Sequence, residues 1–417
     1  MIQTMHRAPV VLLVTLLSAA AFSAAGRQPA PPGWPLDVRA LPSPAAGDSG
    51  QPQLTVSDRG VLVSWVERSG TSATLKFAER SQGGWSAPVT VATGANWFVN
   101  WADVPSVLRL ADGSLAAHWL QKSGPGTYAY DVRLSVSRDN GRTWSKSFTP
   151  HHDGTATEHG FTSLVQMPGA WLGLVWLDGR GMAPSTPGAH GHGGAGAMSL
   201  RFAAFDRDLK QTADEQVDGR VCECCPTSAV VTGDGLLAAF RNRGDDELRD
   251  IHVARYAGGR WTDSTPVHHD NWRVAACPVN GPALSARGRT VAAAWFTVKD
   301  DVGHAYVAFS DDAGRTWGPP LQLDGTQSTG RVDVELLPDG SAVALYLEPG
   351  DGRAHVRMRR VDRVRGASAP LTVASVAAGR SSGHPRMALH GSELVFAWID
   401  GGRVKAGAAD VRGTIGR

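Results

Sequence analysis

Cysteine, tyrosine and long apolar runs are scarce in this chain, and neither sign of charge dominates. There are 4 cysteines and 5 tyrosines against 14 tryptophans. No apolar run is long enough to cross a bilayer, so we expect no membrane span. Lysine and arginine number 41 and aspartate and glutamate 39, which leaves a formal net charge of +2. This balance gives no reason to expect a nucleic acid or a membrane surface as partner.

Glycine and proline are abundant instead, at 49 and 25 residues, which is a turn-rich composition. Hydrophobic residues make up 42% of the chain, enough for a sizeable core. A length of 417 residues would suit two or three domains, but large all-β folds are often a single domain.

The N-terminus has the pattern of a secretory signal peptide. Arg7 supplies the positive charge, residues 10–17 an apolar segment, and Ser23, Ala24 and Ala25 a small-residue cleavage site. No cysteine follows this site, so we expect no lipid anchor. We predict a signal peptide over residues 1–25, a linker over 26–35, a single domain over 36–411 and a tail over 412–417. The mature chain is then exported, to a bacterial periplasm or beyond.

A repeat of roughly fifty residues runs through the chain. Each copy has a short alternating segment, a glycine turn and an apolar run ending near an aromatic residue, and the copies start at residues 52, 105, 162, 226, 282, 332 and 385. Strand–turn–strand repeats at this spacing predict a β-propeller of four-stranded blades. The last copy is too short for a full blade, and residues 36–41 resemble a fourth strand without a blade. We therefore predict an all-β, seven-bladed propeller closed by its N-terminal strand, which also removes exposed edges.

One aromatic residue recurs at the same register of every second strand, and we expect it to pack between blades. The set is Trp65, Trp119, Trp176, Phe240, Trp295, Tyr346 and Trp398.

Two segments match the Asp-box pattern Ser-x-Asp-x-Gly-x-x-Trp, at residues 137–144 and 310–317. Residues 83–85 and 258–261 resemble degenerate copies of the same pattern. The chain therefore resembles the sialidase/BNR-repeat propeller superfamily over residues 36–411. The Asp accepts hydrogen bonds within its turn, so the box is a folding device and says little about activity.

The chain departs from the sialidases in several respects. Sialidases have six blades, which is the alternative architecture, and they carry an Arg-Ile-Pro motif that is missing before Pro52. They also use a Tyr nucleophile with a Glu partner and an Asp acid/base. Tyr346 lies on the packing register, and no catalytic residue carries over by motif. The chain also looks like exported bacterial proteins labelled sialidase-like that share its two cysteine stretches, a likeness that implies no secure activity.

The cysteines lie in two loops that lead into adjacent blades. Cys222, Cys224 and Cys225 are in one and Cys277 is in the next, so we expect all four to converge. Two disulfides are one interpretation, although adjacent cysteines make the pairing crowded. A Zn or Cu site is another, with donors from His159, His190, His192 or His384. A redox-active pair of Cys222 and Cys225 is the third.

Aligning the repeats places Cys225, Arg331 and His384 at one register, immediately before the inner strands, so they should ring the channel mouth. Arginines on the same face suggest a substrate-binding cluster for a carboxylate or sulfate, with His384 beside it. The arginines are Arg180, Arg241, Arg243, Arg331 and Arg380, and the candidate catalytic acids are Asp103, Asp178 and Asp246. Alternatively, most of these arginines pair with neighbouring carboxylates and only shape the face.

Two function classes follow. The first is a sialidase-like protein that binds a small-molecule or glycan ligand, as a glycoside hydrolase of exo-sialidase type if it is an enzyme. The second is a periplasmic Cu- or Zn-binding or thiol-redox protein. We expect a monomer in either case.

Overall fold

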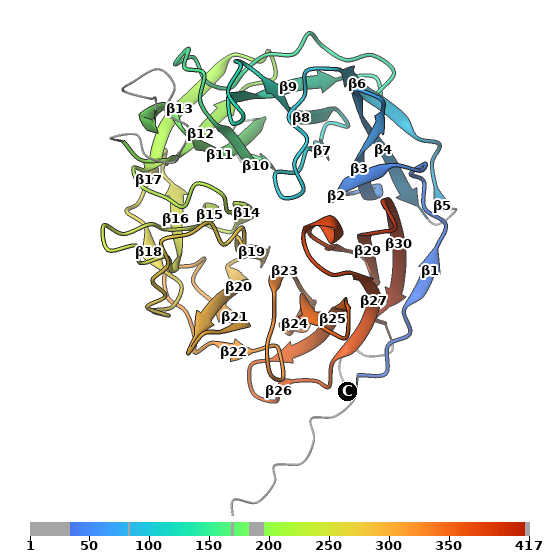
Figure 1. Cartoon of the computed structure of the whole chain (residues 1–417), viewed down its shortest axis with the longest axis vertical. Coiled ribbons are helices and arrows are strands. Elements are labelled where there is room, and N and C mark those ends of the chain that lie inside the picture. The colour runs from blue at the N-terminus through green and yellow to red at the C-terminus, as the bar shows by residue number, and fades with distance from the viewer. Residues whose placement is uncertain (1–33, 82–83, 168–170, 183–195, 413–417) are drawn as a thin grey trace, which may run out of the picture.

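The computed structural model describes residues 34–81, 84–167, 171–182 and 196–412, which form a ring of seven antiparallel sheets around a central channel (Figure 1). This confirms the all-β, seven-bladed propeller and rules out six blades. We number the blades 1 to 7 in chain order. The innermost strands line the channel and are β2 (Ser49–Ser57), β7 (Ser106–Arg109), β10 (His159–Gln166), β14 (Ser228–Thr232), β19 (Ala283–Arg287), β23 (Gly330–Leu336) and β28 (Arg386–His390).

The second and third strands of each blade pair outward from these. The second strands are β3 (Gly60–Ser69), β8 (Leu115–Lys122), β11 (Leu172–Asp178), β15 (Gly235–Arg241), β20 (Thr290–Lys299), β24 (Ala342–Pro349) and β29 (Glu393–Asp400). The third strands are β4 (Ser72–Ser81), β9 (Tyr130–Ser137), β12 (Ser199–Phe205), β16 (Ile251–Ala257), β21 (Val302–Ser310), β25 (Arg353–Asp362) and β30 (Arg403–Asp410).

The outer strands are short and less regular, and two single-turn 3-10 helices complete the elements. The outer strands are β5 (Gly84–Trp85), β6 (Val89–Gly94), β13 (Gln211–Asp218), β17 (Arg260–Trp261), β18 (Thr265–Pro266), β22 (Leu321–Gln322), β26 (Gly366–Ala367) and β27 (Leu371–Ala377). The helices are η1 (Arg180–Met182) and η2 (Arg380–Ser382). Among the described residues, blade 2 has only an isolated bridge between Leu134 and Phe148 at this outer position.

The N-terminal strand β1 (Arg39–Leu41) closes the ring by pairing antiparallel with β30 of blade 7. Closure therefore occurs as predicted, over a shorter stretch than residues 36–41. Trp34, which the sequence analysis placed in a linker, is buried against blades 6 and 7. The predicted signal peptide lies outside the described residues.

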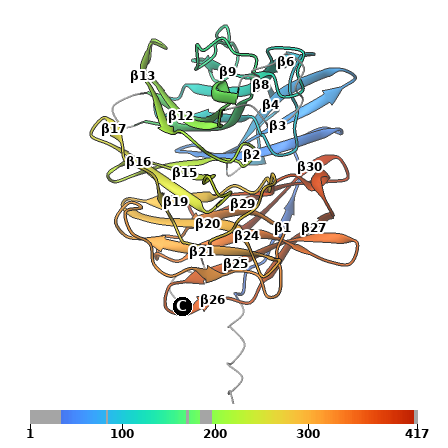
Figure 2. The ribbon, with the colours of Figure 1, turned by 60° about the vertical axis from the view of Figure 1, so that its left-hand side comes forward.

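The core consists of apolar clusters between neighbouring blades, so each sheet is buried on both faces. In Figure 2 the sheets of successive blades lie face against face. Leu75 of blade 1 packs with Leu115 of blade 2, and Phe202 of blade 3 packs with Leu236 of blade 4. The recurring aromatic residues lie in these clusters as predicted: six are buried and Trp398 is half-buried.

The inner strands enclose a cavity of about 990 Å³ that all seven blades line. Loops leading into the inner strands gather at one end of the channel, together with the loops between second and third strands. We call this side the mouth face. The two segments with the Asp-box pattern form turns after β9 and β21, on the opposite face.

The Asp312 turn offers a test of what holds a blade together. Its carboxylate accepts hydrogen bonds from Ser310 Oγ (2.8 Å), Thr316 N (2.9 Å) and Thr316 Oγ1 (2.6 Å). We expect Asp312→Ala to lower the free energy of unfolding by about 1–2 kcal/mol, because the turn's donors lose their acceptor. Denaturant unfolding measures this.

Asp311→Ala is the matched control. Asp311 is exposed and pairs with Arg363 at the surface, so its loss should cost less than about 1 kcal/mol. Equal losses for the two variants would contradict a structural role for the Asp312 turn.

Candidate functional site

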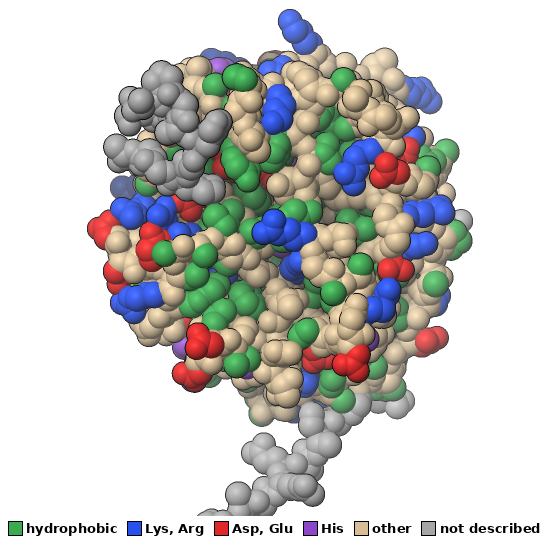
Figure 3. Space-filling model, viewed as in Figure 1, with side chains coloured by type: hydrophobic (Ala, Val, Ile, Leu, Met, Phe, Trp, Pro, Cys, Tyr) green, Lys and Arg blue, Asp and Glu red, His purple; other side chains and the backbone are tan. Residues whose placement is uncertain are grey.

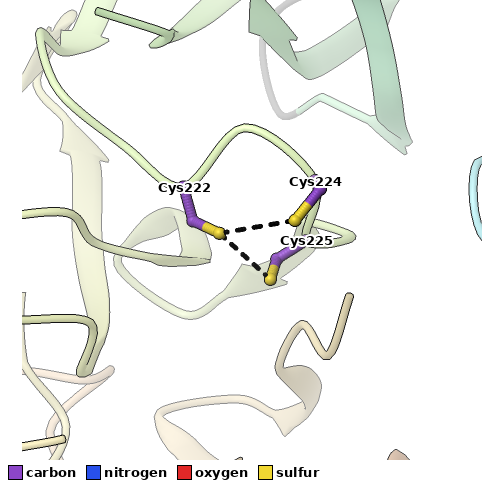
Figure 4. Close-up of side chains that lie close together, drawn as sticks. All are labelled: Cys222, Cys224 and Cys225. Atoms are coloured by element: carbon purple, nitrogen blue, oxygen red, sulfur yellow. Dashed lines mark hydrogen bonds between the residues drawn. The ribbon is translucent and has the colours of Figure 1, made fainter. Parts of the chain in front are cut away.

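Three thiols meet on the mouth face, in the loop between β13 and β14. The Sγ atom of Cys222 lies 3.8 Å from that of Cys224 and 3.3 Å from that of Cys225 (Figure 4). Cys222 and Cys225 are each 1% exposed. All four cysteines are free thiols, so the structure contains neither of the disulfides that the sequence left open.

Hydrogen bonds from Cys224 and then Cys225 hold the pKa of Cys222 well below its usual range, and the positive charge of Arg249 adds to this effect. Arg249 Nη1 donates to Cys222 Sγ over 3.1 Å. The side chain of Glu223 is buried beside the thiols and pairs with Arg243 and Arg249. Cys222 is therefore the thiol most ready to carry a negative charge.

Cys277 reaches the same cluster from the neighbouring loop, where it hydrogen-bonds Cys224, and this bond lowers the pKa of Cys277 to about 7. The two loops touch backbone to backbone. A Cβ on Gly281 would lie 1.9 Å from the carbonyl oxygen of Pro226, so only glycine fits at this position. The sulfurs of Cys222, Cys224 and Cys225 therefore lie together, and Cys277 approaches them from the neighbouring loop.

Arg241 and Asn280 fix this second loop. The buried guanidinium of Arg241 donates to the backbone oxygens of Asn280 (2.9 and 2.8 Å), Arg249 (2.6 Å) and Phe296 (2.7 Å). The side chain of Asn280 in turn accepts the N–H of Arg331 over 2.8 Å. The predicted substrate contact of Arg241 does not fit these surroundings, because its donors are occupied by backbone.

A second group of residues surrounds Trp101, in the loop before β7. The Arg331 guanidinium lies 4.7 Å from the Trp101 ring centroid and that of Arg380 lies 5.9 Å from it. The His384 ring stacks on the indole at 5.5 Å. Arg380 belongs to η2, near the centre of Figure 1, and Figure 3 shows basic side chains gathered at the centre of the same face.

These basic groups have few partners. Arg331 Nη1 donates to Ser382 Oγ (2.7 Å) and to the Gly383 carbonyl (2.9 Å), and neither Arg331 nor Arg380 pairs with a carboxylate in the described part of the chain. Burial, together with the positive charge of Arg380, lowers the pKa of Arg331 to about 10. Burial also lowers the pKa of His384 well below its usual range, and its Nε2 atom is buried without a hydrogen bond.

A buried carboxyl, Asp103, and a half-buried one, Glu158, share one phenol near the thiols. The Tyr130 hydroxyl lies 2.7 Å from Glu158 Oε1 and 3.0 Å from Asp103 Oδ2. Burial raises the pKa of Asp103 to about 7 and that of Glu158 to about 8, and the charges of Asp103, Cys277 and Cys222 add to the second shift. A phenol has one proton to donate, so at least one of the two carboxyls has to hold a proton for both contacts to be hydrogen bonds.

His159 is surrounded by carboxylates and not by thiols. Its Nε2 lies 3.3 Å from Asp153 Oδ2 and 3.8 Å from Asp178 Oδ1, and its ring stacks on His151 at 3.9 Å. The structure thus places His159 among carboxylates and away from the cysteine cluster that it was predicted to join. The donor atoms of Asp153, His159 and Asp178 lie close enough together to hold a metal ion, as do those of Asp131, His151 and His159.

The remaining predicted residues are engaged in ion pairs. Arg180 Nε donates to Asp178 Oδ1 over 2.7 Å. Burial by itself raises the pKa of Asp178, but the hydrogen bonds from Arg180 and the charges of His159 and Arg180 together lower it. Asp246 is exposed and pairs with Arg273 at 2.7 Å. These positions fit the alternative of a salt-bridge network that shapes the face. His190 and His192 lie outside the described residues.

Several residues of the site were missed from the sequence: Trp101, Tyr130, Glu158, Glu223 and Arg249. Aligning the repeats identifies positions next to the inner strands, whereas Trp101 lies within the loop that precedes β7. Tyr130 begins a third strand, and its partner Glu158 immediately precedes β10. The one sequence signal for these residues was that Glu158 stands directly before His159, at the end of a polar loop that leads into an inner strand.

No family model matches the chain, and no curated protein matches it. Several solved structures are similar to it at low identity. A K499G mutant of the NanB sialidase from Streptococcus pneumoniae is 9% identical with a TM-score of 0.47, over 90% of this chain and 94% of that chain. A protein of unknown function from Dyadobacter fermentans is 12% identical with a TM-score of 0.47, over 90% and 98%.

A polysaccharide lyase of family PL25, an ulvan lyase, is 11% identical with a TM-score of 0.49, over 78% of this chain and 80% of that chain. The chain is thus a β-propeller whose distant structural neighbours include a sialidase and a polysaccharide lyase. At this level of similarity the chemistry of the mouth face has to be inferred from its own side chains. No helix among the described residues has the length and apolar character needed to cross a membrane.

Glu158→Gln should reduce the pH dependence of stability. The pKa of Glu158 is raised from its ordinary 4.5 to about 8 in the folded chain. Between these values the unfolded chain loses this proton while the folded chain keeps it, so rising pH destabilises the wild type. We therefore expect the difference between the wild-type Tm and the Tm of Glu158→Gln to decrease from about pH 5 to about pH 8 and then to stay constant.

The control is Asp246→Asn. The hydrogen bond from Arg273 lowers the pKa of Asp246, so this group titrates below that pH range. The Tm difference between Asp246→Asn and the wild type should stay constant over it. If the Tm difference between Glu158→Gln and the wild type also stayed constant over this pH range, that would contradict a raised pKa of Glu158.

Proposed function

We propose that the chain is an exported protein that binds an anionic glycan at its channel mouth, with Arg331 and Arg380 contacting a carboxylate. The observation that carries the proposal is that both guanidinium groups lie against one indole, Trp101, without a carboxylate partner among the described residues. A carboxylate placed between them would receive charge-assisted hydrogen bonds, which are the strong ones in proteins.

Electrostatics favours an anion at this position. The lowered pKa of Arg331 shows that burial and Arg380 both oppose its charge, yet a pKa of about 10 keeps it protonated at neutral pH. Two like charges are therefore held close together in a partly buried place. An anionic ligand relieves that repulsion, and the unpaired Nε2 of His384 offers a further hydrogen bond beside it.

The glycan class is supported by Trp101. Trp101 is half-buried, and an indole face suits the apolar face of a sugar ring. Ligands whose carboxylate belongs to a sugar, such as sialosides and uronates, therefore fit the site better than simple carboxylates.

Hydrolysis is the second candidate, favoured by the contact of Tyr130 with Glu158 and Asp103, since a sialidase uses Tyr, Glu and Asp. Two observations weigh against it. Tyr130 is completely buried, and burial with the two carboxyls raises its pKa well above the usual value, which opposes formation of a phenolate nucleophile. The arrangement favours binding without turnover.

Replacing the mouth arginines should weaken glycan binding. We expect Arg380→Ala and Arg331→Lys each to lower affinity for a sialylated or uronate-containing oligosaccharide about 10-fold or more, since each removes charge-assisted hydrogen bonds. Isothermal titration calorimetry measures this. The conservative Lys is chosen at position 331 because Arg331 is 9% exposed.

Arg289→Ala is the control, because Arg289 is an exposed arginine that pairs with Asp234 on the opposite face. It should bind like the wild type, and the carboxamide analogue of the ligand should bind no variant. Full affinity in both mouth variants would refute the arginine assignment.

A fluorogenic sialoside tests hydrolysis separately. We expect the wild type to release no more fluorophore than buffer, because Tyr130 is buried and protonated. Turnover that is abolished by Tyr130→Phe would establish the enzymatic alternative.

A further inference from the structure

The thiol cluster lies outside the group that surrounds Trp101 and has a geometry of its own. Cys222, Cys224 and Cys225 turn their sulfurs toward one another from within four consecutive residues (Figure 4). A disulfide joins sulfurs at about 2.05 Å. The separations of 3.3 and 3.8 Å are well beyond bonding distance, so these thiols are packed together without being bonded.

The same separations match those of sulfurs that share a metal ion. A tetrahedral Zn²⁺ with Zn–S bonds of about 2.3 Å places its sulfur ligands about 3.8 Å apart. The Cys222–Cys224 separation is 3.8 Å, and that of Cys222–Cys225 is a little shorter, at 3.3 Å. Closing the three thiols around one ion needs only small side-chain movements.

The sulfurs of Cys222, Cys224 and Cys225 lie within 4.8 Å of one another, and Cys277, on the neighbouring loop, would complete a tetrahedron by moving its side chain toward them. Cys277 interacts with Cys224, and the close approach of Gly281 to Pro226 fixes the distance between the two loops. Cys277 is also the exposed member of the set, whereas Cys222 and Cys225 are buried. The site is therefore open on one side, by which an ion enters.

The donor set selects the kind of ion. Cysteines alone make up this group of donor atoms among the described residues, because His159 is directed toward Asp153 and Asp178. All-thiol sites prefer Zn²⁺ or Cu⁺ over Ca²⁺, Mg²⁺ or Mn²⁺. Arg249 donates to Cys222 Sγ and orients it, as residues behind the ligands of metal sites commonly do.

We propose that Cys222, Cys224, Cys225 and Cys277 together bind one thiophilic ion, Zn²⁺ or Cu⁺, at the mouth of the propeller. The site is distinct from the anion site at Arg331 and Arg380, and it stands even if no glycan binds there. Binding of the ion displaces the thiol protons to solvent and involves no change of oxidation state.

Metal analysis and thiol counting on the same sample test the proposal. The full chain is purified without chelator, analysed for Zn and Cu, and then denatured under anaerobic conditions for thiol titration. We expect one ion and four reactive thiols per chain. Four oxidised cysteines without metal would show two disulfides and overturn the proposal.

Cobalt identifies the ligands. Metal-free protein titrated with Co²⁺ should develop sulfur-to-cobalt charge-transfer absorption at one equivalent, and Zn²⁺ or Cu⁺ should abolish it by competition. Cys222→Ser and Cys277→Ser should each weaken Co²⁺ binding at least ~100-fold, since each removes a ligand. His159→Asn should develop the same sulfur-to-cobalt bands as the wild type, because its imidazole lies among carboxylates.

The thermal unfolding of each variant is measured in parallel, so that loss of the site is distinguished from loss of the fold. Wild-type Co²⁺ absorption without sulfur-to-metal bands would overturn the assignment. So would Co²⁺ binding as tight as that of the wild type in folded Cys222→Ser or Cys277→Ser.

Discussion

The hydrogen bonds of Arg241 and Asn280 are the constraint on which the mouth face depends. Arg241 extends from the end of β15 in blade 4 and holds the backbone of Asn280 in the loop that leads into blade 5. Asn280 then accepts the backbone N–H of Arg331, at the start of blade 6. Burying a guanidinium is costly, and here backbone oxygens accept its hydrogen bonds in place of a carboxylate. Three successive blades are thereby held in register at the channel.

The fold could be predicted because it is repetitive. The sequence holds seven copies at a spacing near fifty residues, and these predict a ring of seven blades. Each copy has an aromatic residue at one register, such as Trp176 or Trp295, and these residues pack in the interfaces between blades. The leftover strand before the first copy determines closure on β30. The number of copies was enough to predict the fold, because each blade buries its two faces only against the neighbouring blades.

The candidate site could be predicted only in part, and the reason is where its side chains lie. Arg331 and His384 were placed at the mouth because they precede inner strands, and both contact Trp101. Trp101 itself comes from the middle of a loop, whose path no periodicity describes. Whether an arginine is free or paired also depends on local geometry: Arg180 binds Asp178 two residues earlier, whereas Arg380 has no carboxylate partner within the described part of the chain.

The two sites of the mouth face balance charge in opposite ways. At the thiols, Arg249 and Arg243 offset Glu223 and a Cys222 that tends to ionise, so the cluster is rich in potential anions. At Trp101, Arg331 and Arg380 lie against one indole, and neither pairs with a carboxylate of the described residues. Asn280 lies between them: its backbone oxygen is held by Arg241 next to the thiols, and its side chain holds the backbone of Arg331. The loop that carries Cys277 therefore also positions the backbone of Arg331.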